Sequence, residues 1–219
     1  MSKYEAIKAL FEENADAEKA VEMKKYMRDL FAYYGIPTPQ RKEIYKDFLK
    51  AEKKSKKADW PFLDLCCQDE HREFQYLVSD YLLALAQYLT IEDIPKIREY
   101  VLTKSWWDTV DFLSKVIGRI SDSDPDVDML MLEWARDENR WIRRTAIEYQ
   151  LGKKERTNTE VLEVILTVNF GTDDFFINKA IGWALREYSK TDPAWVADFI
   201  REHRDEMNAL SIREGSKYL

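Results

Sequence analysis

The feature that most constrains the fold is a motif that recurs at a nearly constant interval. In each copy a polar stretch is followed by a bulky apolar residue, and these anchors are Phe74, Trp107, Trp141, Phe176 and Ile212. Their spacings are 33, 34, 35 and 36 residues. Each interval holds two helices, and such pairs stack because one pair cannot bury its own apolar face. The repeat predicts an all-α superhelix, an α-solenoid in which one helix of each pair lines the concave side.

Apolar spacing within the repeats also favours helices. Between Phe74 and Leu85 the apolar residues recur at intervals of three and four, and no alternating strand pattern persists. A second helix is expected between anchors, for example over Ile91 to Leu102 and over Asp126 to Arg136. The dipeptide Asp192-Pro193 places a capping side chain before a proline, which is typical of a helix start.

We expect one domain over residues 1–219. Residues 1–57 do not follow the period and are predicted to form a helical cap that ends in the Lys-rich linker Lys50 to Lys57. Residues 58–219 are predicted to form the helical-pair repeats. Nothing in the sequence points to oligomerisation, so we expect a monomer.

Charge is distributed unevenly along the chain. The formal net charge is -7, which by itself argues mildly against a nucleic-acid partner. However, residues 41–57 carry eight Lys or Arg against three acids, and residues 122–138 carry seven acids against one Arg. A chain of this kind can present a basic face to DNA and an acidic face to solvent.

Several other classes of protein are disfavoured. The first residues lack the apolar segment of a signal peptide, and no apolar run is long enough for a membrane span. Cys66 and Cys67 are adjacent, which makes them a poor disulfide pair, and only two histidines are present. We therefore expect a cytoplasmic protein of bacterial type, associated with the nucleoid when bound to DNA, with no metal, no cofactor and no membrane partner.

The anchor helices carry an unusual set of side chains on one face. Asp111 stands four residues after Trp107, and Arg144, Lys179 and Trp183 stand three, three and seven residues after their own anchors. Offsets of 0, 3, 4 and 7 share one helical face. Two indoles, a carboxylate and two cations are therefore predicted to line a common groove.

Plainer interpretations of these residues stay open. Tryptophans at helical spacing are usually core residues, and charge runs usually form a solvated face. Asp111 could also be a structural partner of Arg144 in the next repeat.

Four segments resemble the AlkD-type DNA alkylation repair family, and the similarity extends over nearly the whole chain. These segments are Tyr26-Met27-Arg28 with Gly35 to Arg41, Ser105 to Asp111 (SWWDTVD), Trp141 to Ala146 (WIRRTA), and Lys179 to Tyr188 (KAIGWALREY). The resemblance implies an α-α superhelix, a HEAT-like or ARM-type solenoid with a concave DNA-binding groove. It also implies a monofunctional DNA glycosylase that excises positively charged N3- or N7-alkylated purines, such as 3-methyladenine and 7-methylguanine, from double-stranded DNA in base excision repair.

The resemblance also implies roles for individual residues. Asp111 would be the catalytic carboxylate, Trp107 and Trp183 would flank the lesion, Arg144 would contact the DNA backbone beside it, and Tyr26 would complete the site from the cap. The choice of Arg144 over its neighbour stays open. The remaining candidate phosphate contacts are basic residues of the repeats: Arg143, Lys153, Lys154, Lys179, Arg186, Arg213 and Lys217.

These residue types suit the chemistry that the resemblance implies. A purine alkylated at N7 or N3 carries a positive charge and leaves as a neutral base, so a strong general acid is unnecessary. A carboxylate such as Asp111 would stabilise the cationic sugar that develops as the bond breaks. An indole face attracts cations by about 0.5–2 kcal/mol. The alternatives are a non-catalytic scaffold that binds DNA or protein, and a relative that binds DNA structure without glycosylase activity.

Overall fold

The computed structural model describes all residues, 1–219, and contains fourteen α-helices, five short 3-10 helices and no strand. The predicted all-α fold is therefore confirmed. The chain divides into two compact units, Met1–Leu89 and Thr90–Leu219, and each is described by itself. No helix combines the length and the apolar character that a membrane span requires.

The first unit contains six α-helices. They are α1 (Lys3–Glu13), α2 (Ala17–Tyr26), α3 (Thr38–Ile44), α4 (Lys46–Glu52), α5 (Trp60–Gln68) and α6 (Arg72–Leu85). Its core contains the buried Phe11, whose ring lies 5.0 Å from that of Phe74. The loop before α3 is anchored to α6, because the buried Glu73 carboxylate accepts hydrogen bonds from the backbone N–H groups of Gly35 and Ile36 at 3.0 and 3.2 Å.

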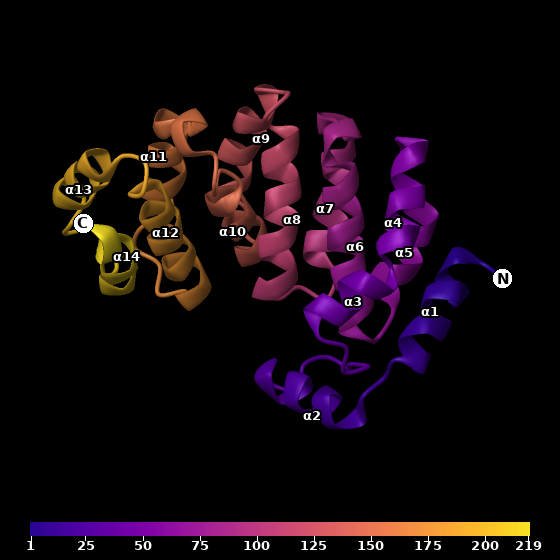
Figure 1. Ribbon diagram of the computed structural model, residues 1–219. Coiled ribbons are helices and arrows are strands. Elements are labelled where there is room, and N and C mark those ends of the chain that lie inside the picture. Colours follow the sequence, from indigo (N-terminus) through magenta and orange to yellow (C-terminus); the bar gives the residue numbers. More distant parts are fainter. The chain divides into compact units, whose positions relative to one another are not determined.

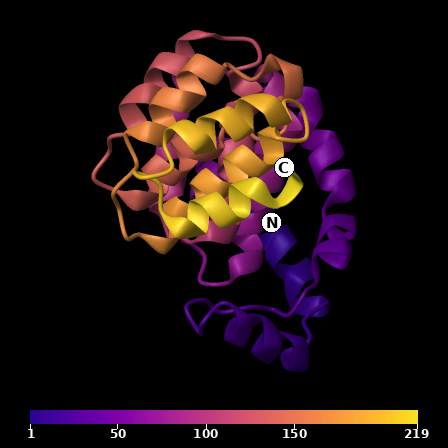
Figure 2. The same cartoon turned by 90° about the vertical axis from the view of Figure 1, so that its left-hand side faces the viewer.

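The second unit is a stack of helix pairs. Its helices are α7 (Ile94–Leu102), α8 (Trp107–Ile120), α9 (Asp126–Trp134), α10 (Arg140–Glu148), α11 (Thr159–Thr167), α12 (Phe175–Tyr188), α13 (Pro193–Glu202) and α14 (Ala209–Gly215). Helices α8, α10, α12 and α14 contact one another in that order and form what we call the first row (Figure 1). The second row consists of α7, α9, α11 and α13, and Figure 2 shows the yellow C-terminal pair in front of the orange one.

Local sequence explains where the first-row helices begin. They start at Trp107, Arg140, Phe175 and Ala209, so their spacing follows the predicted repeat. The side chains that precede the last three helices, Asn139, Asp174 and Asn208, each accept a backbone N–H bond from the first turn. The expected helix over 91–102 is a 3-10 turn, Ile91–Asp93, followed by α7, and the one over 126–136 ends at Trp134.

The two compact units do not divide the chain where the sequence pattern does. The predicted cap covers residues 1–57, whereas the first unit extends to Leu89 and includes α5 and α6. Helix α6 begins beside Phe74, the first anchor of the period, yet it packs with α5 in the first unit. The division into a cap over 1–57 and repeats over 58–219 stays a prediction.

Candidate functional site

Equivalent positions on successive first-row helices carry the charged candidates. Asp111, Arg144, Lys179 and Arg213 are each the fifth residue of their helix, in α8, α10, α12 and α14. Because the helices pack side by side, these positions follow one another across the row. The sequence prediction that Asp111, Arg144 and Lys179 share a face therefore agrees with the packing of the second unit.

Asp111 and Arg144 form a bidentate ion pair. Nε of Arg144 donates to Oδ1 of Asp111 at 2.9 Å, and Nη2 donates to Oδ2 at 3.0 Å. Asp111 is 9% exposed and Arg144 only 3%. Two parallel N–H···O bonds between ionised groups are the strong form of this interaction. The ion pair links α8 to α10 and fixes the carboxylate that the sequence singles out.

Arg144 has two further partners. Its Nη2 lies 2.8 Å from Oε1 of Glu148, one turn later on α10, and its Nη1 donates to the backbone carbonyl of Phe176 on α12 at 2.7 Å. Burial by itself would lower the pKa of Arg144, but the neighbouring carboxylates of Glu148 and Asp111 outweigh it and raise the pKa. Arg144 is thus a permanent cation that joins three helices.

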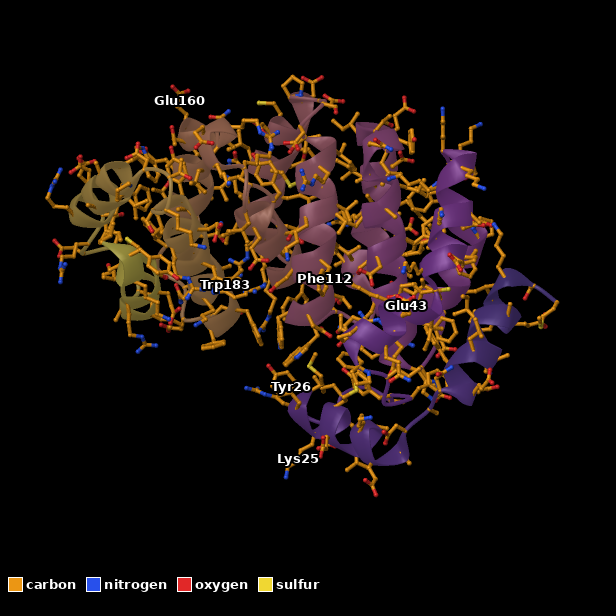
Figure 3. All side chains as sticks on the ribbon, viewed as in Figure 1. Lys25, Tyr26, Glu43, Phe112, Glu160 and Trp183 are labelled. Atoms are coloured by element: carbon orange, nitrogen blue, oxygen red, sulfur yellow. The ribbon has the colours of Figure 1, made fainter.

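Trp183, the ninth residue of α12 and labelled in Figure 3, has its ring near Arg144 of this ion pair. It is half-buried, with the guanidinium carbon of Arg144 at 5.9 Å and that of Arg186 at 5.6 Å from its ring centroid. Both distances are near the outer limit for a cation–π contact. The indole therefore has two cations near its ring, and it lies on the same helix row as Asp111.

Three aromatic rings pack together along the first row, and the first of them belongs to Trp106 and not to the predicted anchor Trp107. The ring of Trp106 lies 5.8 Å from that of Trp141 and 5.1 Å from that of Phe176, and the last two are 4.9 Å apart. Trp106 precedes α8 with an extended backbone (φ -156°, ψ 161°), which directs its ring to this cluster. Trp107 opens α8, is half-buried, and stands one turn before Asp111.

Glu214 on α14 gathers three of the predicted phosphate contacts. Its carboxylate lies 3.0 Å from Nζ of Lys179, 3.2 Å from Nη1 of Arg186 and 2.8 Å from Nζ of Lys217. Hydrogen bonds, first from Lys217 and then from Lys179, lower the pKa of Glu214 to about 2. Because Glu214 is buried and ionised, it holds these cations close together at the end of the first row.

The other predicted contacts lie in different surroundings. Lys154 and Arg213 are exposed, and Arg143 is half-buried. The side chain of Lys153 is 10% exposed, its Nζ donates to Ser121 at 2.6 Å, and burial lowers its pKa. Lys153 therefore braces the end of α8, and its role as a phosphate contact stays a prediction.

Tyr26 belongs to the first unit. It is the last residue of α2 and is 73% exposed. Figure 3 labels its side chain on that helix. An exposed tyrosine at a helix end is suited to an external ligand, but its participation in a site with Asp111 stays a prediction.

Two functional candidates were missed from the sequence, Glu148 and Glu214. Both look like surface glutamates on amphipathic helices, and both are buried. One signal was available for Glu214: the helical Gly182 opposite it, where a side chain would obstruct the approach of α14.

Comparisons with known proteins identify the family of the chain. The family model described as DNA alkylation repair enzyme matches residues 7–219. A solved structure described as a predicted DNA alkylation repair enzyme from Enterococcus faecalis is similar, with a TM-score of 0.86 and 35% sequence identity, covering 94% of this chain and 96% of that one. A search of curated proteins gives no match. With its family model spanning nearly the whole sequence, the chain belongs to the DNA alkylation repair enzyme family.

Proposed function

We propose that this protein is a DNA glycosylase that excises cationic N3- and N7-alkylated purines from duplex DNA. The observation that carries the proposal is the placement of Asp111: a carboxylate held rigidly on α8, near the surface, with a half-buried indole on the same helix row. Membership of the DNA alkylation repair enzyme family supports DNA as the substrate.

The proposed chemistry depends on charge. An alkylated purine already carries the positive charge that makes it a good leaving group, so the protein needs to stabilise the sugar cation and position water. Asp111 would act on the sugar through its negative charge, because a fixed carboxylate in a poorly hydrated site interacts strongly with a developing cation. Trp107 and Trp183 would offer indole faces to the charged base.

Arg144 would anchor the DNA backbone beside the lesion. A guanidinium has five N–H donors, and the hydrogen bonds to Asp111 and Phe176 use Nε, one Nη2 hydrogen and one Nη1 hydrogen, while Nη2 also lies at ion-pair distance from Glu148. The remaining Nη1 hydrogen would donate to a phosphate oxygen. In this way Arg144 would link the catalytic carboxylate to the DNA strand while it keeps its hydrogen bonds to Asp111 and Phe176.

The basic residues of α12 and α14 would hold the backbone further along. Lys179, Arg186 and Lys217 are already gathered around Glu214, and Arg213 is exposed on the same helix. Contacts of this kind are independent of sequence and weaken with salt. We therefore propose that a single copy of the chain binds duplex DNA mainly through phosphates.

One observation favours a second candidate, a non-catalytic DNA-binding scaffold. The bidentate bond from Arg144 neutralises Asp111, which is what a purely structural ion pair would do. On that hypothesis Asp111 contributes to stability alone.

Base release from methylated duplex DNA separates the two candidates. We expect the purified protein to release 7-methylguanine and 3-methyladenine, and we expect Asp111→Asn to abolish release while the protein still binds DNA. Asp198→Asn, which changes an exposed carboxylate on α13, is the matched control and should behave like wild type. Release of neither base by the folded wild-type protein would overturn the glycosylase proposal in favour of the scaffold.

A further inference from the structure

Glu148 is a fully buried carboxylate that the proposed reaction leaves without a role. It is the last residue of α10 and is 0% exposed. Its Oε1 lies 2.8 Å from Nη2 of Arg144, but neither carboxylate oxygen has an aligned hydrogen-bond donor. A charge buried with so little hydrogen bonding is costly, and structural positions of this kind are usually apolar.

Some of the surroundings of Glu148 raise its pKa and others lower it. Burial, the largest cause, raises the pKa of Glu148 well above its ordinary value, and the negative charge of Asp111 raises it further. Arg144 on its own helix and Lys115 on α8 lower it. On α12 the cations Lys179 and Arg186 are paired with Glu214. Glu148 therefore loses its proton at a higher pH than an ordinary glutamate does.

The charge of the Asp111–Arg144–Glu148 group depends on this residue. Asp111 and Arg144 cancel each other through their bidentate bond. With Glu148 protonated the group is neutral, and with Glu148 ionised it carries one negative charge. Only the second state presents net negative charge to a cationic lesion.

We infer that Glu148 is a positioning residue of the site: it holds Arg144 against Asp111 and, when ionised, restores the negative charge that Arg144 removes from Asp111. This inference rests on the proposed glycosylase function. It predicts that excision accelerates as pH rises through the ionisation of Glu148, because the ionised group stabilises the sugar cation better.

Glu148→Gln is the most direct test, because it keeps the shape and removes the charge. At a pH where Glu148 of the wild type is ionised, we expect the variant to excise 7-methylguanine about tenfold more slowly in a single turnover. A loss of this size corresponds to one charge removed near the reacting cation. The variant makes the site one charge more positive, so its affinity for undamaged duplex should be equal or higher. The rise of excision with pH should disappear. Glu160→Gln on α11 is the control, since Glu160 is exposed and points away from Trp183 (Figure 3).

Two results would overturn the inference. One is wild-type excision by Glu148→Gln at every pH. The other is a parallel loss of excision and duplex affinity together with a lower Tm, which is the behaviour of a residue needed only for folding.

A second readout does not require activity. A carboxyl whose pKa is raised by folding destabilises the native state as pH increases, so the Tm of wild type minus that of Glu148→Gln should decrease from acid toward alkaline pH. In the background of Lys115→Gln, an exposed position, the decrease should extend to higher pH, because a cation that favours ionised Glu148 is gone. Parallel melting curves would contradict the assignment. If wild type releases no base but this decrease is seen, the glycosylase proposal fails while the charge assignment of Glu148 stands.

Discussion

A Cβ atom placed on Gly182 would lie 2.5 Å from the Cβ of Glu214. The absence of a side chain at Gly182 therefore lets α14 seat against α12, and it brings the Glu214 carboxylate to Lys179, Arg186 and Lys217. A backbone contact thus determines where three cations gather.

Gly182→Ala should separate these two helices. A methyl group forced into a packed contact costs about 1–3 kcal/mol of unfolding free energy, and the Glu214 ion pairs should weaken with it. Urea denaturation measures the first effect. Gly152→Ala is a control in which the added methyl group meets no atom within 4 Å. Its positive φ of 83° adds backbone strain, so any loss of stability in this control comes from the backbone and not from a packing clash. Unchanged stability in Gly182→Ala would contradict the close approach of α14.

Arg144→Met should be severely destabilising. It removes the shared partner of Asp111 and Glu148, and breaking a buried ion pair on one side costs about 3–5 kcal/mol. Arg201→Met, which removes an exposed cation of α13, should cost less than about 1 kcal/mol. Chemical denaturation of both variants provides the comparison, and equal stabilities would show that the Arg144 network contributes little.

Glu214→Gln should change both acid stability and DNA binding. Because folding lowers the pKa of Glu214 to about 2, its contribution to stability is present above the ordinary glutamate pKa of about 4.3 and is lost as pH falls toward 2. The variant should therefore lose less stability than wild type over that acid range. It should also bind undamaged duplex about two- to fivefold more tightly with a steeper salt dependence, since three cations lose their carboxylate. Weaker binding at low salt would mean that Glu214 is required to position the cations.

The adjacent tryptophans Trp106 and Trp107 should respond differently. Trp106→Ala removes a ring from the cluster with Trp141 and Phe176 and should cost about 2–4 kcal/mol of unfolding free energy. Trp107→Ala and Trp183→Ala should lower lesion excision by about 3- to 30-fold, the equivalent of a cation–π contact, with less effect on undamaged-DNA binding. Equal losses of excision and binding in the last two variants would count against a lesion-sensing role.

The second unit could largely be predicted from the sequence. Its helices follow the apolar spacing, and the near-constant interval between anchors places equivalent residues on neighbouring helices. This reasoning brought Asp111, Arg144 and Lys179 to one face, and it also left open the structural ion pair that Asp111 and Arg144 form. In a stacked repeat, equivalent positions of successive repeats become neighbours in space, which is why these contacts could be predicted from the sequence.

Features that depend on side-chain depth could not be predicted. Glu148 has an ionisable side chain on an amphipathic helix, and its burial results from the packing of the neighbouring helices around α10. The choice between Trp106 and Trp107 depends on the extended backbone before α8, which periodicity does not encode. The division of the chain after Leu89 depends on which helices α6 packs against, and not on the anchor that it carries.

The most direct test of the glycosylase account is the single-turnover rate constant for release of 7-methylguanine from a duplex with one such lesion. Wild type and Asp198→Asn should release the base at the same rate. Asp111→Asn should be slower by at least about 100-fold, as expected for loss of a group that stabilises the transition state, while its affinity for the duplex stays within about twofold. Excision by Asp111→Asn at the wild-type rate would contradict the account, because Asp111 would then serve only as the structural partner of Arg144.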